Sequence, residues 1–263
     1  LSTYAIAKIN MFLHGLDSAD IQRGDTLADP KFLNPDGSLK TFDICVANPP
    51  YSVSEWEYEK FKSDKHGRIT GYEMPPAKKA DYAFVLHMIK SMNENGRAGI
   101  VLPHGVLFRG GAEGRIREQF IKNDLIEAII ALPSKLFYGT GIPAAIVIFN
   151  KNKPEDHKNK IIIIDAEQDF EEGKNQNRLR KKDIEKIVSA FEGYKDIKKY
   201  AKVVDIKEIE ENEFNLNIRR YIENSEEEIV VDVKEVWNEL KEIEKEREVG
   251  DKKVEGYLKE LKY

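Results

Sequence analysis

Apolar and polar positions alternate along most of the chain in blocks that predict strands and helices in turn. Short apolar runs rich in β-formers predict strands at 42–47, 99–103, 125–132, 144–149 and 161–164. Apolar residues at a spacing of three or four predict helices at 2–14 and 179–194. The segment 81–92 is apolar almost all round and predicts a buried helix, and a further helix is predicted to carry Ile116, Phe120 and Ile121. A shorter strand, ending in a Gly-Asp turn, is predicted at 21–25. Strands and helices that alternate in this way are typical of an α/β fold with a mostly parallel sheet.

One pair of strands departs from that rule. The strands at 125–132 and 144–149 are too close in sequence for a full helix to lie between them. A parallel crossover needs about a dozen residues or more. This pair is therefore predicted to be antiparallel, which would place one antiparallel strand in an otherwise parallel sheet.

The composition excludes several classes of protein. The chain has 263 residues, 41% hydrophobic and 34% charged, which fits one large or two small globular domains. It contains no run of 18 apolar residues and no signal-peptide pattern at its start, so we expect a cytoplasmic protein that neither spans a membrane nor is exported. The single cysteine, Cys45, rules out an intrachain disulfide, and the five histidines show no metal-ligand spacing. The net charge of −5 neither demands nor forbids nucleic acid.

The most informative stretch is Phe42–Ala47 followed by Asn48, Pro49, Pro50 and Tyr51. The apolar run predicts a buried strand, and the two prolines end it. Pro49 forces Asn48 out of the helical region, and neither proline has an N–H to donate. The result is a stiff turn at the carboxyl end of a strand, where ligands bind in open α/β sheets.

This turn suits one chemical problem, which is making a conjugated NH₂ group nucleophilic. The lone pair of the adenine amine is delocalised into the ring, so its nitrogen is a poor nucleophile. Acceptors on both amine hydrogens, the Asn48 side-chain oxygen and the Pro49 carbonyl, would stabilise the positive charge that develops during methyl attack. Tyr51 would stack on the base once it has been flipped out of the duplex. As a bare tetrapeptide the turn could also be a plain strand ending.

Other stretches accompany the turn, at 3–15, 24–26, 79–84, 101–111, 132–133, 138–143 and 215–221. With them, most of residues 1–222 resembles the adenine-N6 DNA methyltransferases, and more closely the modification subunit of type I restriction–modification systems. The resemblance implies an α/β, Rossmann-like S-adenosylmethionine-dependent methyltransferase sheet, followed by a helical C-terminal region. The composition changes near residue 150, and apolar residues return at a spacing of three or four from Val233 onwards. We therefore expect a partial methyltransferase catalytic domain at 1–155, a mixed α/β extension at 156–228, and a C-terminal helix or coiled-coil-like segment at 229–263. That last segment either packs on its own domain or docks on a partner subunit.

The resemblance also implies roles for individual residues. The catalytic loop is formed by Asn48, Pro49, Pro50 and Tyr51. Asp25 corresponds to an acidic residue near the adenine of S-adenosylmethionine, although it could instead be a turn residue after Gly24. Phe108 is a candidate second stacking surface for the flipped base, although it could instead pack in the core.

One departure from the family pattern concerns the cofactor. Family members carry a Gly-rich loop after their first strand and an acidic residue that ends the second, and neither precedes the helix at 2–14. The chain therefore resembles the C-terminal part of a modification subunit, with N-terminal strands missing between 21–25 and 42–47. We expect residues 1–263 alone to bind S-adenosylmethionine poorly and to be poorly stable. The glycines at 110, 111 and 114 are interpreted as a DNA-facing or helix-entry loop.

The expected function is transfer of a methyl group from S-adenosylmethionine to a flipped-out adenine in double-stranded DNA. By resemblance, the partners are double-stranded DNA, a specificity subunit, a restriction (translocase/endonuclease) subunit and a second modification subunit. The charged segment 52–80 could close over DNA, or it could be a solvated loop without that role. Two alternatives remain, a methyltransferase that acts on a protein glutamine and an inactive fragment or scaffold that binds the specificity subunit. Cytosine-C5 methylation is disfavoured because no Pro-Cys nucleophile follows a strand.

Overall fold

The computed structural model describes residues 2–138 and 141–222 and five further positions, 237, 240, 241, 244 and 247. The chain divides into a unit Leu1–Glu223 and a unit Asn224–Tyr263. The predicted C-terminal helix at 229–263 lies outside the described residues, apart from those five positions. No helix in the described part of the chain is long and apolar enough to cross a membrane.

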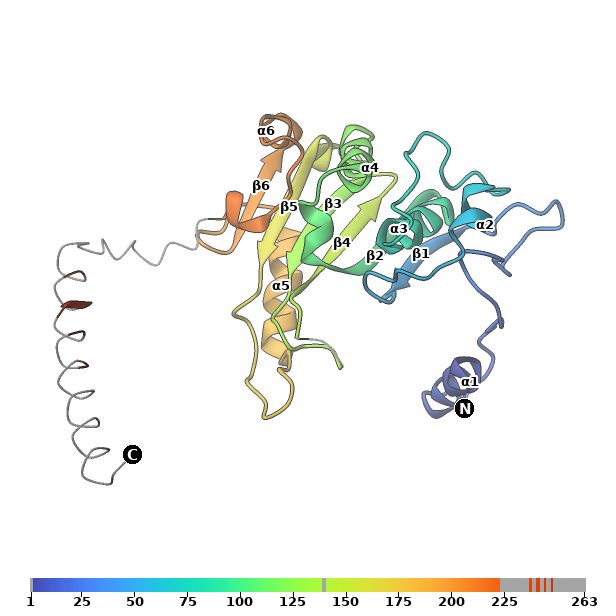
Figure 1. Cartoon of the computed structure of the whole chain (residues 1–263), viewed down its shortest axis with the longest axis horizontal. Coiled ribbons are helices and arrows are strands. Elements are labelled where there is room, and N and C mark those ends of the chain that lie inside the picture. Colours follow the sequence, from blue (N-terminus) through green and yellow to red (C-terminus); the bar gives the residue numbers. More distant parts are fainter. Residues whose placement is uncertain are drawn as a thin grey trace, which may run out of the picture. The chain divides into compact units, whose positions relative to one another are not determined.

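A six-stranded sheet forms the centre of the first unit, in the order β1-β2-β4-β3-β5-β6 (Figure 1). The strands are β1 (Phe42–Ala47), β2 (Met92–Pro103), β3 (Ile126–Ala131), β4 (Ala144–Asn150), β5 (Lys160–Asp165) and β6 (Ala201–Asp205). β1 is parallel to β2 and β3 is parallel to β5, whereas β4 is antiparallel to both β2 and β3. The predicted antiparallel pair at 125–149 is therefore confirmed. β6 adds a second reversed strand, antiparallel to β5.

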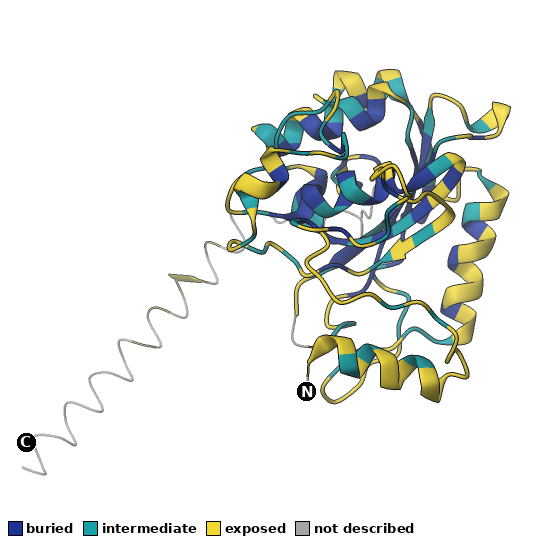
Figure 2. Ribbon diagram, turned by 90° about the vertical axis from the view of Figure 1, so that its right-hand side faces the viewer, coloured by how far each residue is buried: buried dark blue, intermediate teal, exposed yellow. Residues whose placement is uncertain are grey.

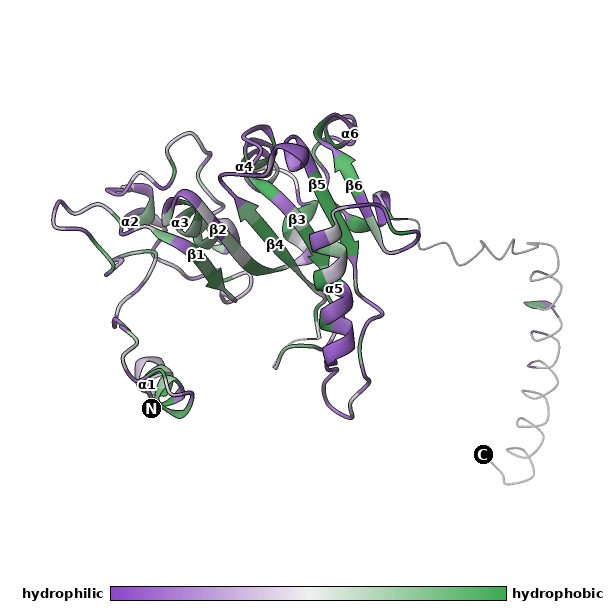
Figure 3. Ribbon diagram, turned by 180° about the vertical axis from the view of Figure 1, so that it is seen from behind, coloured by the Kyte–Doolittle hydropathy of each residue, from purple (hydrophilic) through white to green (hydrophobic). Residues whose placement is uncertain are grey.

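Helices cover the two faces of the sheet unequally. The helices are α1 (Thr3–Leu13), α2 (Tyr58–Lys62), α3 (Asp81–Lys90), α4 (Ala112–Lys122), α5 (Lys181–Gly193) and α6 (Ile206–Glu211), with 3-10 turns η1 (His104–Leu107), η2 (Glu155–His157) and η3 (Ile218–Arg220). Apolar side chains of α3, α4 and α6 share one core with one face of the strands. Those of α5 share a second core with the opposite face, over which α5 lies in Figure 3. On β5, Ile161 and Ile163 face the first core and Ile162 and Ile164 the second, as alternation along a strand requires.

The edge strand β1 departs from the prediction of a buried strand. Cys45 and Ala47 pack against the first core, but Ile44 is 74% exposed and Val46 is 78% exposed. The apolar run was correctly interpreted as a strand, but one of its faces is uncovered because α5 packs only against the far half of the sheet. Helix α1 likewise contains no buried residue, and most of it is exposed in Figure 2.

One predicted strand and one predicted strand boundary are wrong. The segment 21–25 forms no strand and is not part of the six-stranded sheet. The second strand begins at Met92 rather than at residue 99, directly after α3. Met92 is buried and pairs with Phe42 at the start of β1, and the polar residues that follow it lie at an irregularity in the register before Arg97 pairs with Ile44.

The topology brings the chain segments that follow four strands to one edge of the sheet, the edge formed by the ends of those strands. β1, β2, β3 and β5 run in the same direction, so their carboxyl ends meet there. The segment after β2 is fixed by a distant stretch, because the Leu216 N–H donates to the Leu107 carbonyl at 2.9 Å. The predicted boundary between a catalytic domain and an extension near residue 155 stays a prediction, and the sheet itself continues across that point through β5 and β6.

Candidate active site

The Asn48–Tyr51 turn follows β1 directly at this edge. Asn48 is exposed, Pro49 is buried and Pro50 is exposed. The Asn48 side chain makes no hydrogen bond within the described part of the chain, so its amide oxygen is available to a ligand. Tyr51 is half-buried, and its hydroxyl is buried without a hydrogen-bond partner among the described residues. Burial raises the pKa of Tyr51, so the ring stays neutral at physiological pH.

A buried carboxylate that the sequence reasoning did not single out holds the chain just after this turn. Asp81, in the first turn of α3, is 1% exposed, and it accepts the Ser52 N–H at 2.7 Å. The same carboxylate accepts Arg109 Nη2 at 2.8 Å. Arg109 follows Phe108 directly, so one carboxylate contacts both loops that carry the proposed stacking rings. The signal was present in the sequence, because Asp81 lies within the matching stretch at 79–84.

Asp25 caps a turn in the structure. Its Oδ1 accepts the N–H groups of Leu27 and Ala28, each at 2.9 Å. Among the described residues no hydrogen bond uses its other oxygen. The interpretation of Asp25 as a turn residue is therefore confirmed, and its cofactor role stays a prediction in which Oδ2 would be the contacting atom.

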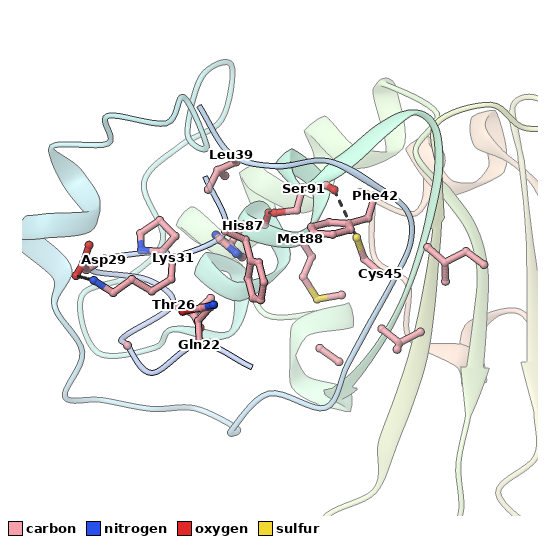
Figure 4. Close-up of a pocket in the computed structure, with 16 residues that line it drawn as sticks. Gln22, Thr26, Asp29, Lys31, Leu39, Phe42, Cys45, His87, Met88 and Ser91 are labelled. Atoms are coloured by element: carbon pink, nitrogen blue, oxygen red, sulfur yellow. Dashed lines mark hydrogen bonds and ion pairs between the residues drawn. The ribbon is translucent and has the colours of Figure 1, made fainter. Parts of the chain in front are cut away.

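A groove of about 420 Å³ lies along β1 next to this turn (Figure 4). Its walls are the strand itself, the segment around Gly24 and Thr26, and the His87–Met88 side of α3. Burial, followed by the nearby charges of Arg68 and His66, lowers the pKa of His87 to about 4, so this histidine is neutral in the folded protein at pH 7.

The groove fits only part of S-adenosylmethionine. Its apolar walls suit the adenine end, which needs a flat apolar slot and a polar group at its rim. Asp25 is not among the lining residues, although its neighbours Gly24 and Thr26 are. Gly24 is the one glycine among the described lining residues, so no Gly-rich turn is present there to wrap the methionine end. The groove also lies between 21–25 and 42–47, where N-terminal strands are expected to be missing. A cofactor site here therefore stays a prediction, and no chemical step is assigned through it.

Phe108 lies at the same edge, after η1, and is 45% exposed. It lines a hollow of about 270 Å³ together with Gly110, Gly111 and Phe214. Gly111 is the N-cap of α4 with φ of 68°, a backbone conformation that favours glycine, so the helix-entry interpretation is confirmed for Gly110 and Gly111. It is wrong for Gly114, which lies inside α4. The stacking role of Phe108 stays a prediction.

The segment 52–80 is anchored more firmly than a solvated loop. Phe61 is fully buried, and the Arg68 guanidinium lies over its ring at 4.2 Å. Arg68 also pairs with Asp64 at 3.0 Å and donates to the Leu27 carbonyl at 2.9 Å, so it is not available to a phosphate. The cations of this segment that remain exposed include Lys62, Lys65 and Lys78.

These features define the class of the protein. Four of the six strands run in the same direction, β4 is reversed between β2 and β3, and β6 is reversed at the end of the strand order. An Asn-Pro-Pro-Tyr turn follows at the carboxyl end of β1. This is a Rossmann-like α/β methyltransferase arrangement.

Comparison with known proteins agrees. Residues 1–229 match the model of the N-6 DNA Methylase family. The type I restriction enzyme MjaVIII methylase subunit of Methanocaldococcus jannaschii is 41% identical over 98% of this chain and 46% of its own length. The MpnII methylase subunit of Mycoplasma pneumoniae is 33% identical over 99% of this chain and 49% of its own length. The crystal structure of a type I restriction-modification system methyltransferase subunit from Streptococcus thermophilus is similar, with a TM-score of 0.75 and 38% identity over 84% of this chain and 46% of that one.

The chain belongs to the N-6 DNA methylase family. It spans about half the length of the curated relatives it matches.

Proposed function

We propose that this chain supplies the methyl-acceptor half of an adenine-N6 DNA methyltransferase of the type I restriction–modification kind. The observation that carries the proposal is the exposed Asn48 amide, free of partners within the described residues, at the end of β1. Its neighbour Pro49 is buried and has no backbone N–H, so the carbonyl, an acceptor, is its one backbone hydrogen-bonding group.

In this proposal the target adenine is flipped out of the duplex and its amine lies between the Asn48 Oδ1 and the Pro49 carbonyl. Both acceptors draw on the amine hydrogens and stabilise the positive charge as the nitrogen attacks a methyl group. A preorganised acceptor of this kind contributes most where it does not have to reorient during reaction. The proton leaves the nitrogen after methyl transfer, so no tuned general base is required. Tyr51 stacks on the base.

S-Adenosylmethionine supplies the electrophilic methyl group, with Asp25 and the β1 groove at its adenine end. The partners proposed from the relatives are double-stranded DNA, a specificity subunit that selects the site, a second modification subunit and a restriction subunit. Such an assembly would act on DNA in the cytoplasm. The relatives' names support the system as a whole, since they describe type I restriction enzyme methylase subunits.

The test is the identity of the methylated product. The complete polypeptide that contains residues 1–263, together with its specificity subunit, is incubated with tritiated S-adenosylmethionine and unmethylated genomic DNA or a total protein extract. The proposal predicts label in DNA, recovered as N6-methyladenine. Label in protein, recovered as methylglutamine, would overturn it in favour of the glutamine alternative, because an amide presents the same planar NH₂ group to the turn. No label in either acceptor would favour the scaffold alternative.

A further inference from the structure

A single buried carboxylate links the two loops that flank the proposed base-binding site. Asp81 Oδ1 accepts the Ser52 N–H at 2.7 Å, and Asp81 Oδ2 accepts Arg109 Nη2 at 2.8 Å. The Ser52 hydroxyl is a further donor to Oδ2, at 3.4 Å. Ser52 follows Tyr51 and Arg109 follows Phe108, so each contact lies one residue from a proposed stacking ring.

The contact at Ser52 supports an unfavourable backbone conformation. Ser52 has φ of 51°, in the left-handed region that non-glycine residues rarely occupy. Such residues persist where the surroundings fix them, and here the fixing group is a charged acceptor on the N–H. The Ala80 N–H also donates to the Val53 carbonyl at 3.1 Å. The N-terminus of α3 therefore holds two consecutive residues, Ser52 and Val53, directly after the turn.

The contact at Arg109 joins a loop that is itself rigid. Arg109 Nε lies 2.8 Å from Glu113 of α4, a carboxylate that is 3% exposed. Arg117 donates to the Arg109 carbonyl at 2.9 Å and to the Val106 carbonyl at 3.0 Å. Because Glu113 and Arg117 of α4 hold the loop that carries Arg109, the Asp81–Arg109 ion pair fixes Asp81, and with it the Ser52 backbone, relative to this loop.

We propose that Asp81 is a positioning residue, which holds the Asn48–Tyr51 turn through Ser52 and fixes it relative to the Phe108 loop through Arg109. The inference rests on the proposed function, because the turn is taken to act on an adenine amine. Asp81 itself need not touch the base. Its loss would let the turn relax and misplace the two acceptors, and small displacements of such groups lower the rate strongly.

The test compares Asp81 with a matched residue elsewhere in the fold. Asp183, 4% exposed in the first turn of α5, also accepts a backbone N–H, that of Arg180 at 2.8 Å, and the Arg180 guanidinium at 2.7 Å. It packs on the other face of the sheet. Asp183→Ala therefore removes the same kind of contacts and controls for a general loss of stability.

Three measurements are made on the complete polypeptide that contains residues 1–263. Hydrogen exchange of the Ser52 amide is expected to accelerate at least about tenfold in Asp81→Ala and not in Asp183→Ala, because only the former loses a hydrogen bond to a charged acceptor at that amide. The kcat for DNA methylation is expected to fall at least about tenfold in Asp81→Ala with little change in the KM for DNA. Asp81→Asn keeps an acceptor for Ser52 but turns an NH₂ group towards Arg109. Its Ser52 exchange should therefore be slower than in Asp81→Ala, whereas its kcat should stay below that of the unaltered protein.

The results separate the positioning role of Asp81 from the proposed function. Unchanged Ser52 exchange in Asp81→Ala would show that Asp81 does not hold the Ser52 backbone, and accelerated exchange with an unchanged kcat would show that this contact does not position the catalytic turn. Either result would overturn the proposal. An equal fall in kcat in Asp183→Ala would attribute the effect to stability and also overturn it. Failure of the proposed function itself would appear differently, as absence of N6-methyladenine with the unaltered protein.

Discussion

His87 makes the stability of the fold depend on pH in a direction that the structure fixes. Its Nδ1 is buried without a hydrogen-bond partner among the described residues, and burial is the largest cause that lowers its pKa from 6.5 to about 4. Between those two values the unfolded chain binds a proton that the folded chain does not. Stability from this group is therefore complete above about pH 6.5 and is lost progressively as the pH falls towards 4.

The magnitude follows from the two pKa values. Linkage gives a loss of about 2 kcal/mol at pH 5 relative to pH 7.5 from this group alone. Urea unfolding at both pH values measures the total difference, which also includes the carboxylates. His87→Gln, which stays neutral, should have a pH dependence smaller by about 2 kcal/mol, whereas His14→Gln, at an exposed position, should match the unaltered chain. If His87→Gln and the unaltered chain lose the same stability between pH 7.5 and 5, the reasoning is wrong.

Further predictions concern the core, the cofactor and DNA. Phe120→Ala should lower the free energy of unfolding by about 3–5 kcal/mol, because its ring is fully buried and lies 5.4 Å from that of Phe149; a loss below about 1 kcal/mol in urea unfolding would contradict this. Residues 1–263 alone should bind S-adenosylmethionine weakly, since no Gly-rich turn among the described residues lines the groove along β1 to wrap its methionine end, and calorimetry that shows micromolar binding would refute the prediction. Replacing Lys62, Lys65 and Lys78 together by Gln should reduce the slope of log K against log salt for DNA by about 0.9 for each phosphate that the protein no longer neutralises, whereas Lys181→Gln on α5 should leave it unchanged. An identical slope in the triple variant would exclude these lysines from the DNA interface.

Local pattern was enough to predict most of the sheet. Apolar runs predicted β1, β3, β4 and β5 within a few residues, because each carries β-branched residues, which favour strands. The antiparallel turn of the chain at β4 could be predicted from connection length alone. These features depend only on residues close together in sequence.

Features that depend on distant residues could not be predicted in this way. The start of β2 contains the polar residues 93–95, and its first residue, Met92, is held in the sheet by pairing with Phe42 of β1, fifty residues away in the chain. The exposed face of β1 depends on how far α5 extends across the sheet, which periodicity does not encode. The anchoring of the segment 52–80 depends on Arg68 reaching the Leu27 carbonyl, 41 residues away in the chain.

The candidate site shows the same division. The Asn48–Tyr51 turn could be predicted because its chemistry lies in four consecutive residues. The Asp81 contacts could not, since Ser52, Asp81 and Arg109 come from three separate segments that meet only in the fold. The sequence therefore predicts the turn itself but not the contacts that hold its backbone in place.

The central claim is that the Asn48 amide oxygen activates an adenine amine. The most direct measurement is the rate of N6-methyladenine formation, quantified by mass spectrometry of digested DNA, for Asn48→Ala in the complete polypeptide that contains residues 1–263. Asn95→Ala, at an exposed position near the start of β2, is the matched control. Removing one preorganised acceptor should lower kcat by about 10²- to 10³-fold, with unaltered activity in the control. A rate in Asn48→Ala within about twofold of the control would contradict the account.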